Sequence, residues 1–162
     1  MKKVLVILFV LFCFSSVSLA DLARIYIIVN MDDAPIEILE FGKSRFEDED
    51  HISSVVEIKN RVEKAIEALE VTMVYYDPFN EKEDGVRGIS TKTLRAGVSA
   101  RAGWSTYGNP SFVKTAIAFV SAVRFLDGEV WKADIKEVMK KAGTIPKLEF
   151  LSETKMLEIE KK

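Results

Sequence analysis

The sequence predicts an all-β protein, an antiparallel β-sandwich of about seven strands that ends with one short helix. Three observations lead to this fold. Short runs of β-branched and aromatic residues recur along the chain, turn-forming residues separate them, and only one segment near the C-terminus has the spacing of an amphipathic helix. A closed barrel of roughly eight strands would produce the same pattern, and the sequence leaves that alternative open.

Residues 1–20 have the layout of a cleavable secretory signal peptide. Lys2 and Lys3 precede an apolar run over 4–14, and a stretch of small residues ends at Ala20. An uncleaved membrane anchor is the alternative, although the apolar run is shorter than the roughly 20 residues that span a bilayer. We therefore expect a periplasmic or secreted protein.

Composition narrows the classes of partner. Cleavage after Ala20 would remove Cys13, the only cysteine, so the remaining chain could form no disulfide. It would also remove two of the 23 basic residues and keep all 25 acidic ones. An acidic chain with one histidine is a poor candidate for nucleic-acid or zinc binding. We expect no bound metal, no cofactor and no nucleic acid, and membrane contact only through an uncleaved signal.

The predicted strands cover half of residues 21–146, which form the expected β-sandwich domain. The strand predicted for 66–76 has the clearest two-residue alternation, with one face formed by Leu69, Val71, Met73 and Tyr75. Their number and spacing fit an immunoglobulin-like sandwich. The ranges are 22–29, 36–41, 52–59, 66–76, 86–95, 112–126 and 129–133.

The last two strands are separated by Asp127 and Gly128. Asp-Gly between β-forming runs is typical of a two-residue type I′ hairpin. This turn would pair Phe125 with Val130 and Arg124 with Trp131.

Residues 28–40 and 58–70 form an internal repeat that aligns without gaps. Both copies consist of a strand, a polar turn that begins with Asn30 or Asn60, and a second strand. Asparagine suits such a corner because it tolerates left-handed backbone and bonds to nearby amides. Two hairpins with similar geometry, or a true duplication, would explain the repeat.

One helix is predicted near 134–142. Asp134 is a good N-cap, and Gly143 and Pro146 end the helix. Its apolar stripe consists of Ile135, Val138, Met139 and Ala142. A charged tail follows over 147–162, and the sequence does not decide whether it is ordered.

Residues 58–77 resemble the bacterial extracytoplasmic immunoglobulin-like domains of the FxLYD type. These domains have a strand, a polar turn led by Asn, and a strand that ends in tyrosine and aspartate. Here the motif is Met73-Val74-Tyr75-Tyr76-Asp77, so both bulky positions before Tyr76 differ. The resemblance covers about twenty residues. It implies an exported binding or scaffolding domain and carries no catalytic residues.

The segment 95–111 is predicted to be a long loop rich in glycine and serine. Loops of this length in a compact domain are usually functional. Its arginine and aromatic residues, which are typical of interfaces, are the candidate partner-binding residues Arg95, Arg101, Trp104 and Tyr107. Alternatively, Trp104 folds back as a plug of the sandwich core.

Two acidic segments are weaker candidates. The segment 77–85 could hold calcium, or Asp77 and Asp84 could form the carboxylate pair of a hydrolase. The segment 47–51 places four carboxylates beside His51, which could act as a pH sensor. A solvated turn explains each of them more simply.

The sequence therefore predicts an exported, non-catalytic binding or scaffolding module whose partner is an envelope or extracellular protein. A carrier of a small apolar ligand is the alternative, and a carboxylate-based hydrolase is the weaker one.

Overall fold

The computed structural model describes residues 24–83 and 85–145, so the predicted signal peptide, Asp84 and the tail 147–162 lie outside the described residues. The elements are β1 (Ile25–Ile28), β2 (Ile36–Lys43), β3 (His51–Asn60), β4 (Ile66–Tyr76), β5 (Val86–Ser90), β6 (Ser99–Tyr107), a 3-10 helix (Pro110–Phe112), β7 (Thr115–Phe125), β8 (Val130–Lys132) and α2 (Ile135–Gly143).

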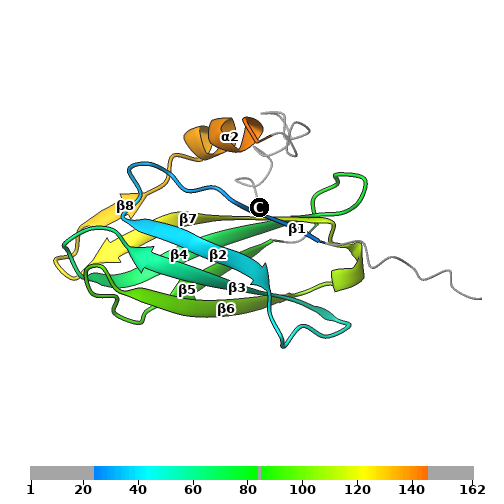
Figure 1. The fold of residues 1–162 in the computed structure, drawn as a ribbon, viewed down its shortest axis with the longest axis horizontal. Coiled ribbons are helices and arrows are strands. Elements are labelled where there is room, and N and C mark those ends of the chain that lie inside the picture. Colours follow the sequence, from blue (N-terminus) through cyan, green and yellow to red (C-terminus); the bar gives the residue numbers. More distant parts are fainter. Residues whose placement is uncertain (1–23, 84, 146–162) are drawn as a thin grey trace, which may run out of the picture.

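The strands form two stacked sheets (Figure 1). The five-stranded sheet has the order β1-β7-β4-β5, with β8 also paired to β7, and the three-stranded sheet has the order β2-β3-β6. The predicted β-sandwich is confirmed, and the barrel alternative is wrong for the described residues because the strands belong to separate sheets. Not every pair is antiparallel, since β1 runs parallel to β7.

The predicted loop over 95–111 is wrong. Residues 99–107 form β6, which pairs with the whole length of β3. Glycine, serine and alanine have low strand propensity and hide the two-residue alternation of this segment. That alternation is nevertheless present, because Ala100, Ala102 and Trp104 point into the sandwich and Arg101 and Gly103 point outward.

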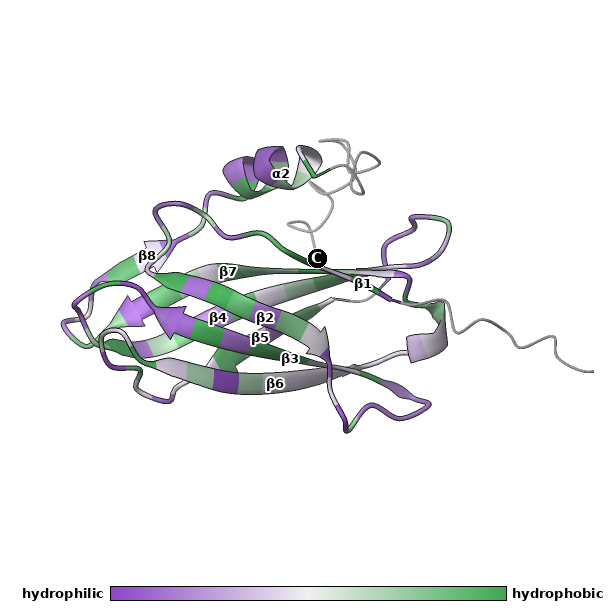
Figure 2. Cartoon of the chain, viewed as in Figure 1, coloured by the Kyte–Doolittle hydropathy of each residue, from purple (hydrophilic) through white to green (hydrophobic). Residues whose placement is uncertain are grey.

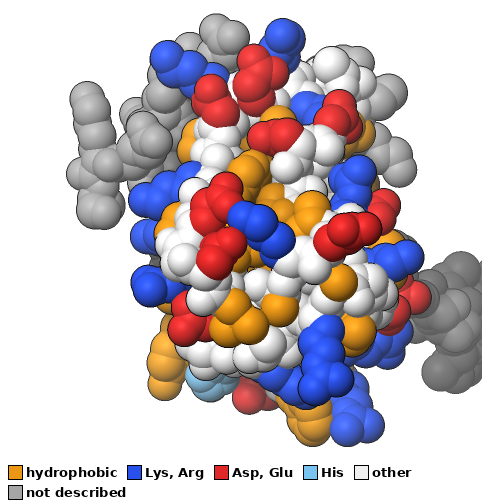
Figure 3. Space-filling view, turned by 90° about the vertical axis from the view of Figure 1, so that its left-hand side faces the viewer, with side chains coloured by type: hydrophobic (Ala, Val, Ile, Leu, Met, Phe, Trp, Pro, Cys, Tyr) orange, Lys and Arg blue, Asp and Glu red, His pale blue; other side chains and the backbone are white. Residues whose placement is uncertain are grey.

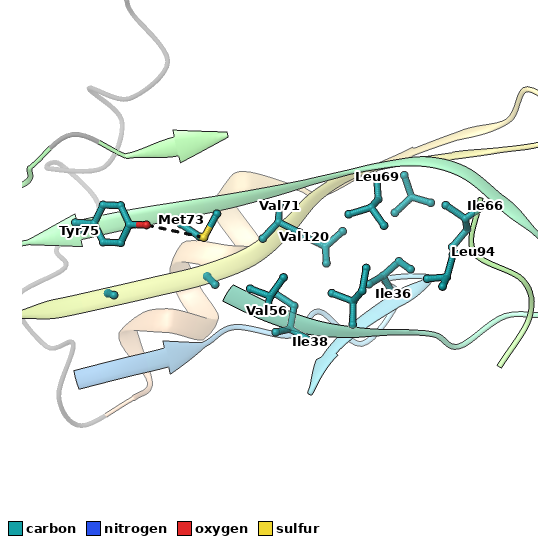
Figure 4. Packing of buried hydrophobic residues seen from close by; sticks show 14 of the residues in the cluster. Ile36, Ile38, Val56, Ile66, Leu69, Val71, Met73, Tyr75, Leu94 and Val120 are labelled. Carbon is teal, nitrogen blue, oxygen red and sulfur yellow. Dashed lines mark hydrogen bonds between the residues drawn. The ribbon is translucent and has the colours of Figure 1, made fainter. Parts of the chain in front are cut away.

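The main core lies between the two sheets. In Figure 4 the side chains of β4 point toward those of β2 and β3, among them Val71, Ile38 and Val56. The buried Tyr75 joins the layers, because its hydroxyl shares a hydrogen bond of 3.0 Å with Ser54 Oγ on the other sheet. Burial raises the pKa of this hydroxyl.

A second core lies on the outer face of the five-stranded sheet, where α2 packs. Val138, Met139 and Ala142 contact apolar side chains of β1, β4 and β7. Figure 2 shows hydrophilic residues on the side of α2 that faces away from the sheet. Because this sheet is covered on both faces, β7 is buried without alternation over residues 115–120.

The predicted helix is confirmed. Asp134 is the N-cap, and its carboxylate accepts a hydrogen bond of 2.8 Å from the amide of Lys136. The helix extends through Gly143, and Thr144 is its C-cap.

The β7–β8 turn differs from the predicted two-residue hairpin. Arg124 pairs with Val130 and Val123 with Trp131, so the register is shifted by one residue. The loop has three residues, and Gly128 adopts a left-handed conformation with φ of 88°. This geometry, a tight turn followed by a left-handed glycine, is the usual three-residue alternative to the type I′ turn.

The two repeats are crossings between the sheets and not hairpins. β1 and β2 lie in different sheets, as do β3 and β4. Asn30 donates to the carbonyl of Ile38 at 2.9 Å and accepts from its amide at 2.8 Å. Asn60, which is fully buried, donates to the carbonyls of Lys64 at 2.8 Å and Leu94 at 3.1 Å. Each asparagine therefore supplies hydrogen bonds at the point where the chain leaves its sheet.

The change Asn60→Ala would lower the free energy of unfolding by about 2–4 kcal/mol, because it removes the hydrogen bonds that this fully buried side chain makes to the carbonyls of Lys64 and Leu94 and to the amide of Val62. Urea denaturation would measure the loss. Asn109→Ala is the matched control, since Asn109 caps the exposed 3-10 helix and should cost about 1 kcal/mol or less. Equal costs for the two variants would contradict the role assigned to Asn60.

Candidate functional site

The structure does not bring the four predicted partner-binding residues together. Arg101 and Tyr107 lie on the outer face of β6, whereas Trp104 points inward. Arg95 is exposed in the connection between β5 and β6. Only Arg101 and Tyr107 thus share a surface, the outer face of the three-stranded sheet.

The centre of this outer face carries few side chains. Gly42 on β2, Val55 on β3 and Gly103 on β6 are in register, so one row across the sheet carries a single side chain. A hollow of about 400 Å³ opens beside this row and is lined mainly by apolar residues of β1, β2 and β3, among them Ile28, Leu39, Phe41 and Val55. Sequence reasoning missed this hollow, although glycines at 42 and 103 are a signal for it once the register is known.

The neighbouring row is charged. Glu40, Glu57 and Arg101 lie side by side on the three strands. Arg101 Nε donates to Glu57 Oε2 at 2.9 Å, and its guanidinium also pairs with Glu40. The hydrogen bond to Glu57 and the charge of Glu40 raise the pKa of Arg101. These pairs hold a planar cation in a defined orientation at the rim of the hollow.

The far end of β6 carries an exposed aromatic residue. Tyr107 is 77% exposed, and its ring lies 4.5 Å from the ring of His51 between centroids. His51 Nδ1 lies 2.9 Å from Asp48 Oδ1, and this hydrogen bond lowers the pKa of Asp48. The ring contact leaves most of the Tyr107 side chain exposed to solvent.

Trp104 packs half-buried against the core, but it does so from strand β6 and not from a loop that folds back. It closes the side of the sandwich between β5 and β6, where its Nε1 donates to the carbonyl of Ile89 at 3.3 Å. Its indole lies against Gly88, where a Cβ would overlap the ring. An edge carbonyl of β5 is thereby covered by a side chain.

A buried ion pair lies at the end of the sandwich where β1 begins. The Glu47 side chain is fully buried and accepts a hydrogen bond of 2.7 Å from Arg24. Lys43 approaches the second carboxylate oxygen at 2.8 Å. Burial alone would raise the pKa of Glu47, but the hydrogen bonds from Arg24 and Lys43 outweigh it and hold the pKa below its ordinary value of 4.5. The expectation of a solvated loop is therefore wrong for Glu47, and no local sequence signal distinguishes it from its acidic neighbours.

The acidic segment after β4 is used for a turn. Asp77 Oδ1 accepts hydrogen bonds of 2.8 Å from the amides of Phe79 and Glu81. Its proposed partner Asp84 lies outside the described residues. Within 24–83 and 85–145, no three histidine, cysteine or acidic side chains are grouped to hold a metal.

The opposite end of the sandwich carries paired charges. Figure 3 shows basic and acidic side chains around apolar ones on this end. Lys64 lies 2.9 Å from Asp127, and Trp131 Nε1 donates to Asp33 at 3.0 Å. The predicted register placed Trp131 opposite Arg124, but Trp131 lies opposite Val123, and Arg124 forms an ion pair with Glu67. These contacts link the loops between strands and use the charged side chains named here. This end is therefore a weaker candidate for a binding surface.

No described helix is long and apolar enough to cross a membrane. No protein-family model matches the sequence, and no curated protein matches it significantly. The resemblance of 58–77 to FxLYD-type domains thus stays a prediction.

The chain is similar to solved structures. A hypothetical protein from Peptoclostridium difficile 630 matches with a TM-score of 0.50 and 14% identity, over 66% of this chain and 90% of that chain. A structural genomics target matches with a TM-score of 0.41 and 17% identity, over 62% and 81% of the two chains. The first likeness concerns the fold alone.

The change Gly88→Ala would push the Trp104 indole out of place and lower the free energy of unfolding by about 1–3 kcal/mol. Chemical denaturation followed by tryptophan fluorescence would show the loss and a red-shifted native spectrum. Gly42→Ala is the control, because a Cβ at Gly42 meets nothing within 4 Å. The packing argument fails if both variants are as stable as the parent protein.

The change Glu47→Gln would destabilise the protein at neutral pH by about 2 kcal/mol, because Arg24 would lose its buried counter-ion. A carboxylate with a lowered folded pKa stabilises the fold above its ordinary pKa of 4.5, and this contribution is lost as the pH falls through the folded value. The difference between parent and variant should therefore shrink in acid. Urea denaturation across pH would measure it, with the exposed Glu49→Gln as control; a difference independent of pH would rule out the ion pair as its source.

Proposed function

We propose that the protein is an exported, non-catalytic binding module that holds a protein partner on the outer face of the three-stranded sheet. The observation that carries this proposal is the unequal covering of the two sheets. α2 packs on the outer face of the five-stranded sheet, whereas no described segment packs on the outer face of β2, β3 and β6. An uncovered sheet with a hollow beside it is a surface on which a partner can bury area.

The chemistry of this face supports a protein partner. Arginine and tyrosine contribute large contact areas and are enriched among residues that dominate binding energy. Arg101 is oriented by Glu57 and Glu40 before any partner arrives, and Tyr107 is braced by His51. Such preorganisation lowers the entropy lost on binding.

A carrier of a small apolar ligand is the second candidate, and the hollow is the observation that favours it. Its volume of about 400 Å³ falls in the range of small-molecule sites. Its rim is charged, however, and the interior between the sheets is filled by side chains. A partner that covers both the hollow and its charged rim uses more of this surface.

Affinity capture would test the proposal. The purified protein, immobilised as bait in an envelope extract, should retain a reproducible companion protein under mild crosslinking. Arg101→Glu, which reverses the rim charge, should reduce capture about tenfold or more, and Tyr107→Ser should weaken it less.

The matched control is Arg87→Glu on the outer face of the other sheet. Arg87 is as exposed as Arg101 and also pairs with a carboxylate, that of Glu70. This variant should capture the companion as well as the parent protein does. Equal losses for Arg87→Glu and Arg101→Glu, or a bait that retains no companion, would reject this face as the binding site.

A further inference from the structure

The free edge of β2 has unpaired backbone groups at two positions. Ser44 N donates to the carbonyl of Ser53 at 2.9 Å, which identifies this residue pair as hydrogen-bonded. Because hydrogen-bonded and non-bonded pairs alternate in an antiparallel ladder, the pair of Gly42 with Val55 is also hydrogen-bonded. The amides and carbonyls of Phe41 and Lys43 therefore point away from β3, on the side where residues 24–83 and 85–145 add no further strand to the sheet.

The rest of this edge is protected. At Ile38, both outward backbone groups are bound by the carboxamide of Asn30. A bulge at Leu39 separates that protected part from residues 40–43. The hollow lies beside Glu40, Phe41 and Gly42 of the unprotected part, and no described strand pairs with β2 on that side. One short stretch of β2 is thus left open to an added strand.

Gly42 lies in the middle of that stretch, and no contact among the described residues requires a glycine there. Its φ is not positive, and a Cβ at this position would meet nothing within 4 Å. Glycine weakens a strand, and its presence inside one often marks a site where another backbone approaches closely. Another backbone on the free side of β2 would account for it.

We propose that β2 of a second copy of this chain pairs antiparallel with this edge, with Gly42 facing Gly42 of the second copy across a two-fold axis. Phe41 then faces Lys43 of the second copy, and the reverse, so every outward backbone group of both residues is paired. Glu40 faces Ser44 of the second copy. The two three-stranded sheets join into one continuous sheet with β6 at both ends.

The sequence of the edge favours this register and this occupant. Sliding one copy by two residues would place Lys43 opposite Lys43, which is repulsive, or would place Lys43 opposite the bulged Leu39. In the proposed register no like charges face each other. Each copy offers the same two outward positions, Phe41 and Lys43, and across a two-fold axis Phe41 of one copy pairs with Lys43 of the other. Two-fold dimers are also the commonest assemblies. The inference goes beyond the proposed function and does not depend on it.

Sedimentation velocity over a concentration series of the purified protein would test the dimer. The parent protein should shift from monomer to dimer as concentration rises. Gly42→Glu and Gly42→Lys place like charges opposite each other at the axis, and each should raise the dimer Kd by about tenfold or more. An equimolar mixture of the two variants should recover the dimer, because opposite charges then face each other.

Two controls keep this result specific. Ser105→Glu and Ser105→Lys change the same outer face on β6, away from the proposed axis, and should leave association unchanged. Chemical denaturation should give each Gly42 variant a stability near that of the parent protein, since position 42 has open space.

A parent protein that stays monomeric at all accessible concentrations would overturn the inference. So would a dimer that persists in both Gly42 variants, or variants that fail to recover it when mixed. Recovery by charge exchange would support both the edge and the register, whatever the outcome of affinity capture.

Discussion

A chain that crosses from one sheet of a sandwich to the other must satisfy backbone groups that have left one ladder and not yet joined the next. In this protein two asparagine side chains meet that constraint. Asn60 is buried and bonds to the β3–β4 and β5–β6 connections, while Asn30 binds both backbone groups of Ile38 as a neighbouring strand would. Without Asn30, both outward backbone groups of the buried Ile38 would lose their partner, which is costly. The stacking of the sheets, and the core between them, depends on both corners.

The sandwich is asymmetric in two directions. Across its layers, the helix gives the five-stranded sheet a second core and leaves the other sheet with one apolar face and one polar face. Along its sides, Trp104 closes the gap between β5 and β6, whereas the gap between β1 and β2 contains a hollow. Both asymmetries leave exposed surface on the three-stranded sheet. The five-stranded sheet is therefore packed on both faces, whereas the outer face of the three-stranded sheet is not covered by the described residues.

The sequence was sufficient for the elements with strong periodicity. β4 matches its predicted range, and α2 has the predicted N-cap and apolar stripe, because alternation and helical spacing are both unambiguous there. β6 was missed since its small residues resemble a loop. That error also affected the site: in a strand, residues 101 and 107 share a face and residue 104 lies on the other, whereas a loop implies no such separation. Burial of Glu47 depends on Arg24, a contact between distant segments that no local pattern encodes.

The parallel pairing of β1 with β7 has a consequence for how the chain folds. Ile25 lies beside Thr115, so the first strand and the seventh come together only after the whole intervening chain has been made. Contacts between such distant segments must overcome a large loop-closure entropy, and they slow folding. During synthesis β1 emerges early but has no ladder to join. Its docking would be a late step, which completes the five-stranded sheet and the surface on which the helix packs.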